Sequence, residues 1–214
     1  MVAASADLAP LEAKIASGMR DSYGINLRFA VGSSGMLARQ IENGAPYDVY
    51  LSANQKLVDE LAARRLVLPE TVRVYALGRL GLWSKDGSTR DPRQLTSPRV
   101  RHLAIPNPAH AAYGLAARQA LERMGIWKGL TGRIVYGENV RQAFKFAEDG
   151  NAEAVLTSWT LLRDRGGVLI DESWHAPIVQ AGAVVASTKN PLAARRLLEF
   201  LTANLAGPCS HGMG

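Results

Sequence analysis

The amino-acid sequence predicts an α/β protein with largely parallel sheets. Segments that alternate apolar and polar residues, as half-buried strands do, repeatedly precede segments with apolar residues every three or four positions, as in amphipathic helices. The chain has 214 residues, 47% hydrophobic and 21% charged, which is enough for one large domain or two modest ones. Because no repeat or Pro/Ser-rich linker is visible, a domain boundary is expected where strands cross between sheets.

The first half of the chain shows this alternation clearly. Apolar residues at helical spacing follow Ser5 and stop at Gly24, where the first helix is expected to end. Ile25 to Val31 alternate as a strand with one buried face, and Gly44 closes the next helix. The elements expected here are a helix over 8–23, a strand over 25–31, a helix over 36–43, a strand over 47–52, a helix over 57–61 and, over 72–77 and 80–83, a long strand pair or a crossing between domains.

The second half continues in the same rhythm. An alanine-rich helix is expected from Tyr113 to Met124, and a last helix from Pro191 to Ala203. The other elements expected are strands over 101–105, 133–136, 154–156 and 168–170, a helix over 140–148, and an extended apolar segment over 177–187.

Four helix starts in this pattern carry the groups of an anion site: Ser5, Ser34, the run 112–114 and the pair 139–140. N–H groups in a helix's first turn have no partner inside the helix, and the helix dipole adds about half a positive charge there. In a parallel sheet such starts lie at the carboxyl ends of the strands, where ligands bind. Gly32 and Gly35 also allow a close approach around Ser34. The plain alternative is that these serines only cap helices, as in any α/β protein.

Composition limits the other functions. The net charge of +6 suits an anionic partner, but the basic residues are scattered, so we expect no nucleic-acid binding. No run of about 18 apolar residues predicts a membrane span, and no signal peptide is visible. The single cysteine, Cys209, excludes an internal disulfide and a cysteine metal cluster.

Enzyme and metal sites find little support. Ser33 and Ser34 lack the G-x-S-x-G elbow of a hydrolase, and no motif places a histidine or an acid beside them, so we expect no enzyme. The four histidines show no metal-ligand spacing and are interpreted as structural or surface residues; they are His102, His110, His175 and His211. The tryptophans are interpreted as core or lobe-surface residues.

Three stretches make the sequence recognisable, namely GSSGMLARQIENGAPYDVYLSANQKLVDEL, AIPNPAHAAYGLAARQAL and VYGENVRQAFKFAEDGNAEAVL. They resemble the periplasmic molybdate-binding protein family, which supplies molybdate or tungstate to an ABC importer, and the resemblance covers roughly residues 3 to 200. It implies a type II periplasmic binding protein fold with a ligand cleft between two α/β lobes. We expect residues 1–79 and 180–214 in lobe one and 80–179 in lobe two.

The resemblance also implies a ligand set and a setting. Ser5, the backbone N–H of Ala6, and Ser34 would hold the oxyanion from the first lobe, and Tyr113 and the amide of Val140 from the second. No direct protein–metal bond is implied, because the metal enters as the oxyanion, and no cofactor is expected. The implied partner is the membrane permease of an ABC transporter, and the implied setting is a monomer in the periplasm. One branch of the family places a tyrosine near Thr157 instead, so Thr157 and Ser158 are interpreted here as helix caps.

The chemistry of the predicted donors agrees with this ligand. Molybdate and tungstate are fully deprotonated dianions at neutral pH, so a site of donors without a carboxylate acceptor suits them and leaves the proton of hydrogen phosphate unpaired. Against sulfate, only the size of the cavity can discriminate. A different class of function is the oxyanion-sensing domain of a cytosolic regulator, but no helix-turn-helix segment accompanies it in this sequence.

Two polar positions near the predicted cleft leave alternatives open. Asp48 either orients serine or backbone groups at the cleft or is a solvated loop acid. The pair 138–139 is expected to cap the helix that begins at Val140, because a carboxylate beside a dianion would repel it.

Overall fold

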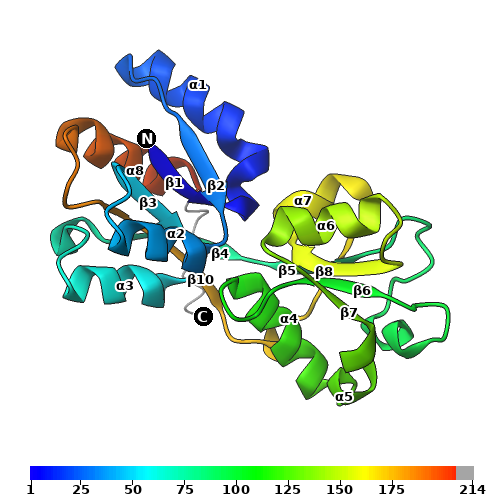
Figure 1. Ribbon diagram of the computed structural model, residues 1–214. Helices are drawn as coiled ribbons and strands as arrows, with labels where there is room; N and C mark the ends of the chain where they lie inside the picture. The colour runs from blue at the N-terminus through cyan, green and yellow to red at the C-terminus, as the bar shows by residue number, and fades with distance from the viewer. Residues whose placement is uncertain (206–214) are drawn as a thin grey trace, which may run out of the picture.

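The protein is built on two five-stranded sheets, each in its own lobe (Figure 1). The computed structural model describes residues 1–205. Helices flank the sheet in each lobe, which confirms the predicted two-lobed α/β architecture. Cys209, His211 and the end of the segment expected in lobe one lie outside the described residues.

The first lobe contains both ends of the described chain. Its sheet has the order β2–β1–β3–β10–β4, with β1 (Val2–Ser5), β2 (Phe29–Gly32), β3 (Val49–Ser52), β4 (Arg73–Gly78) and β10 (Ile178–Val184). Its helices are α1 (Glu12–Tyr23), α2 (Ser34–Glu42), α3 (Gln55–Ala63) and α8 (Pro191–Leu205). Met19 and Leu201 belong to the core under α1 and α8, and Leu37 and Val58 to the core under α2 and α3. The sheet is therefore covered on both faces.

The second lobe is inserted between β4 and β10. Its sheet has the order β7–β6–β8–β5–β9, with β5 (Leu80–Trp83), β6 (Leu103–Pro106), β7 (Ile134–Gly137), β8 (Ala154–Ser158) and β9 (Val168–Leu169). Its helices are α4 (Ala112–Arg123), α5 (Trp127–Leu130), α6 (Val140–Glu148) and α7 (Trp159–Leu162). Leu121 and Leu130 pack with the core under α4 and α5, while Phe144 and Leu162 lie in the core under α6 and α7.

The chain passes between the lobes twice. Arg79 alone separates β4 of the first sheet from β5 of the second, so the crossing proposed for this segment is correct and the strand pair is not. The return passes through residues 170–177 before β10. The lobe boundaries expected at residues 79 and 180 stay a prediction.

Three local expectations are wrong. The sheets are mixed, because β10 and β5 each run antiparallel to both of their neighbours. The strand expected from residue 25 begins only at Phe29, the residue paired with Val2 at the start of the four-residue β1. The first helix begins as the 3-10 turn η1 (Ala6–Leu11) and becomes α-helical only at Glu12, after Pro10, which has no N–H to donate.

Within residues 1–205 there is no helix with both the length and the apolar character that a bilayer crossing requires.

Candidate functional site

A small cavity lies where the two lobes meet. It brings together all five residues of the expected ligand set, which come from both lobes. Its lining consists of Ser5, Ala6, Gly32, Ser33, Ser34, Ala53, Ala111, Ala112, Tyr113, Asn139 and Val140. None of these lining residues is charged. The structure therefore gathers the four predicted helix starts around one space, while the role of each residue in binding stays a prediction.

The start of α2 presents a free hydroxyl proton at this cavity. The Oγ of Ser34 accepts a hydrogen bond from the N–H of Ala53 at 2.9 Å, so its own O–H remains to donate elsewhere. The hydroxyl of Tyr50 donates to the carbonyl of Ser34 at 2.7 Å and so holds the first turn of α2 in place. Ser34 is buried, as a donor to an enclosed anion must be.

The lobes touch beside this turn. The N–H of Gly35 donates to the carbonyl of His110 at 2.9 Å, and Ser33 Oγ lies 2.9 Å from His110 Nδ1. A Cβ at Gly35 would lie 3.0 Å from the carbonyl oxygen of His110, so a glycine permits this approach. Burial, then the charge of Arg39, lowers the pKa of His110, so the imidazole is neutral at this contact.

The Ser33–His110 pair lacks the third group of a catalytic triad among the residues that the structure describes. Sequence reasoning found no histidine near Ser33, because the two residues are 77 positions apart. A general base needs a group that orients its second nitrogen, and no hydrogen bond reaches His110 Nε2 from the residues that the structure describes.

The start of α4 offers backbone donors. The N–H groups of Ala112 and Tyr113 lie in the first turn and have no partner inside the helix. Gly114 brings this turn close to the end of β6, because a Cβ there would lie 2.1 Å from the carbonyl oxygen of Pro106.

The hydroxyl of Tyr113 is engaged behind the cavity. It donates to Asp7 Oδ2 at 3.2 Å and accepts from Gln180 Nε2 at 2.9 Å. Burial, followed by the charge of Asp7, raises the pKa of Tyr113 well above its ordinary value, so the phenol is neutral. Tyr113 lines the cavity as expected, but in this arrangement its backbone N–H is the free donor, and the hydroxyl contribution stays a prediction.

The start of α6 is fixed by two side chains. Asn139 caps the helix as predicted, since its side chain accepts from the N–H groups of Arg141 and Gln142 at 3.0 and 3.1 Å. The Val140 N–H lies in the same first turn, without a partner inside the helix. Thr157 Oγ1 donates to the Val140 carbonyl at 3.0 Å, so the interpretation of Thr157 as a cap is wrong.

The remaining site expectations have mixed outcomes. Ser158 caps α7, as predicted, by accepting from the N–H of Thr160 at 3.4 Å. Asp48 accepts hydrogen bonds from Thr188 and Asn190 at 2.5 and 3.2 Å, so it is not a free loop acid. It lies before the start of β3, whereas the cavity lies at the carboxyl ends of the strands, so it does not orient groups at the cleft.

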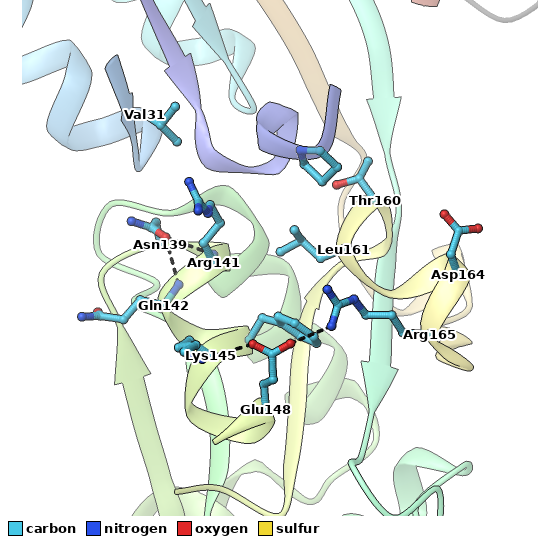
Figure 2. A pocket seen from close by; sticks show the side chains of 12 residues that line it. Val31, Asn139, Arg141, Gln142, Lys145, Glu148, Thr160, Leu161, Asp164 and Arg165 are labelled. Atoms are coloured by element: carbon cyan, nitrogen blue, oxygen red, sulfur yellow. Dashed lines mark hydrogen bonds and ion pairs between the residues drawn. The ribbon is translucent and has the colours of Figure 1, made fainter. Parts of the chain in front are cut away.

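An open groove adjoins the cavity between the lobes (Figure 2). Asn139 lines both spaces, so the groove reaches the rim of the cavity. Charged side chains of α6 and of the segment after α7 line it, and Glu148 pairs with Arg165 at 2.6 Å and with Lys145 at 3.4 Å. Because ion pairs that face solvent contribute little, the small cavity with its unpaired donors is the stronger candidate for a binding site.

Sequence reasoning missed the most deeply buried acid of the site, Asp7. It follows the predicted Ser5–Ala6 pair directly, and this proximity was the available signal. Its partner Gln180 is 173 residues away, and no local sequence pattern predicts that contact.

Comparisons with known proteins give a consistent result. A family model described as bacterial extracellular solute-binding protein matches residues 1–207. The chain is 29% identical over 185 residues to the molybdate-binding protein ModA of Rhodobacter capsulatus, covering 85% of this chain and 73% of that protein. It is 29% identical over 208 residues to ModA of Azotobacter vinelandii, covering 94% and 82%.

Solved structures show the same fold. The periplasmic molybdate-binding protein of Azotobacter vinelandii superposes with a TM-score of 0.88 at 30% identity, covering 97% of this chain and 93% of that one. The sulfate-binding protein SubI of Mycobacterium tuberculosis superposes with a TM-score of 0.74 at 15% identity, covering 94% and 80%. The second likeness concerns the fold alone.

Proposed function

Because the chain belongs to the bacterial extracellular solute-binding protein family, we propose that it binds molybdate or tungstate and delivers the anion to an ABC importer. The observation that carries the proposal is the meeting of four helix starts from two lobes around one cavity with no charged lining residue. The relatives named as molybdate-binding proteins support the choice of ion.

The donors suit a tetrahedral dianion. The Ser34 hydroxyl is left free to donate by the Ala53 N–H, and the first turns of α4 and α6 add backbone N–H groups. A deprotonated dianion accepts at every oxygen, so no carboxylate acceptor is required, and none lines the cavity. A protonated phosphate would lack an acceptor for its proton, which selects against it.

The setting follows from this role. We propose that the protein acts in the periplasm as a monomer, without a cofactor, and that its macromolecular partner is the membrane permease of the importer. The relatives are binding proteins, and within residues 1–205 no acid orients the Ser33–His110 contact, so we propose no catalytic activity. The relatives are named as binding proteins, so they do not support the alternative of a sensor domain in a cytosolic regulator.

The test is a thermal-shift panel with molybdate, tungstate, sulfate, phosphate and chromate, followed by calorimetric titration of the ions that stabilise the protein. Molybdate and tungstate should raise the unfolding temperature increasingly with concentration, as mass action requires, and the other ions should do so far less. Equal stabilisation by sulfate would contradict the proposed selectivity, and no stabilisation by any oxyanion would contradict the function.

A further inference from the structure

A buried carboxyl group lies behind the cavity at the junction of the lobes. Asp7 is 0% exposed and occupies the turn η1, directly after Ser5 and Ala6. Its Oδ2 accepts from Tyr113 Oη at 3.2 Å and from Gln180 Nε2 at 2.5 Å, while Oδ1 has no hydrogen-bond partner among the described residues. Its backbone carbonyl accepts from Thr160 Oγ1 at 2.7 Å.

These contacts join three parts of the molecule. Asp7 belongs to the first lobe, Tyr113 and Thr160 belong to α4 and α7 of the second, and Gln180 lies on β10, the strand by which the chain returns. The cluster is complete only while the lobes are together. Opening the lobes would remove the Tyr113 and Thr160 partners and admit water to the carboxyl group.

The groups that face Asp7 are neutral. The hydroxyls of Ser5 and Tyr113 and the amide of Gln180 surround the carboxyl group. The phenol of Tyr75 also lies nearby, and its pKa is raised first by burial and then by the charge of Asp7. No ion pair with Asp7 exists among residues 1–205. An ionised carboxylate without a cation is costly in a protein interior, and burial raises the pKa of Asp7 accordingly.

We propose that Asp7 is a positioning residue that is protonated when the lobes close on the anion, so that binding of the anion takes up a proton at this carboxyl group. The inference rests on the proposed oxyanion function. In the open protein the hydrated carboxyl group is ionised at neutral pH, and on closure a proton from solvent joins one of its oxygens. The neutral acid avoids both the cost of a buried charge and repulsion of the dianion held by the neighbouring Ser5 turn.

A second titrating contact acts in the opposite sense. Closure places His110 against Ser33, where its neutral form is favoured, so closure releases a proton from His110 as the pH falls towards the ordinary histidine value of about 6.5. His110 therefore weakens binding on the acid side, and Asp7 weakens binding as the pH rises. Arg39 and Glu138 are the charged groups that act on His110.

The test is calorimetric titration of the full chain with molybdate between about pH 5 and about pH 9, in paired buffers that differ in ionisation enthalpy. In the window above the ordinary aspartate value of about 4, the wild-type dissociation constant should rise by up to about tenfold per pH unit in excess of that of Asp7→Asn. The neutral amide needs no proton, so the variant should show less proton uptake by up to one proton and bind at least as tightly at neutral pH.

The controls separate the possible outcomes. Asp164→Asn removes an exposed carboxylate of the adjoining groove and should leave the pH profile unchanged. Identical proton uptake by wild type and Asp7→Asn at every pH would overturn the proposal. If Asp7→Asn does not fold, His110→Gln removes the opposing titration, and absence of proton uptake in that variant would overturn it instead. Failure of every oxyanion to bind would contradict the proposed function itself.

Discussion

Replacing Ser34 by alanine tests the anion site most directly, because this hydroxyl has two roles. Its oxygen accepts from the Ala53 N–H at 2.9 Å, and its proton is free to donate into the cavity. Loss of one donor to a buried charge should weaken molybdate binding by about 1.5–3 kcal/mol, which raises the dissociation constant about 10-fold to 150-fold. Loss of the acceptor leaves the Ala53 N–H unsatisfied and should lower the unfolding free energy by about 1–3 kcal/mol.

The two effects require two measurements. Calorimetric titration with molybdate gives the change in affinity, and urea unfolding of the ligand-free protein gives the change in stability. Ser187→Ala is the matched control, because that serine is exposed and distant in sequence from the site, and both quantities should be unchanged. Wild-type affinity in Ser34→Ala would remove this hydroxyl from the ligand set, whereas a loss of stability with unchanged affinity would leave it a purely structural acceptor.

Three further substitutions test the surroundings of the site. Gly114→Ala should lower the unfolding free energy by about 1–3 kcal/mol or more in urea unfolding, because the new Cβ would overlap the Pro106 carbonyl; a neutral result would contradict the packing of α4. Thr157→Val should lower the unfolding free energy by about 1 kcal/mol in the same assay and weaken molybdate binding, because it removes the hydrogen bond to the Val140 carbonyl at the start of α6. Unchanged affinity would show that Thr157 does not support the site. In the closed, molybdate-bound protein, the raised pKa of Asp7 retains a proton that the unfolded chain loses above about pH 4, so the stability of the molybdate-saturated protein should fall as the pH rises from there through the folded-state pKa. Asp7→Asn should flatten this part of the stability profile, and an unaltered profile in thermal unfolding would refute the assignment.

The helix starts of the site were predictable because their signals are local. Ser34 between Gly32 and Gly35, and Asn139 before an amphipathic helix, each mark a turn within a few residues. The rule that such turns gather at the carboxyl ends of parallel strands then places them together, and the cavity agrees. Prediction was therefore strongest where one short segment determines both the turn and its chemistry.

Long-range contacts were beyond this reasoning. The antiparallel course of β10 depends on the chain returning from the second lobe, and nothing in its apolar pattern gives a direction. The contacts of Asp7 with Gln180 and of Ser33 with His110 join residues 173 and 77 positions apart. Thr157 was misinterpreted for the same reason, because its partner is the carbonyl of Val140 on another element.

The use of neutral donors has a consequence for delivery of the anion. A carrier must hold the ion when closed and release it when the lobes separate, so the ligand should stabilise the closed arrangement only while donors from both lobes reach it. Direct contacts such as Gly35 with His110 favour closure modestly, since one hydrogen bond contributes about 0.5–1.5 kcal/mol. The anion, bridging Ser34 of one lobe and Val140 of the other, would supply the larger share. Separating the lobes then divides the donor set, and a permease that binds the open form would lower the affinity without any chemical change in the ion.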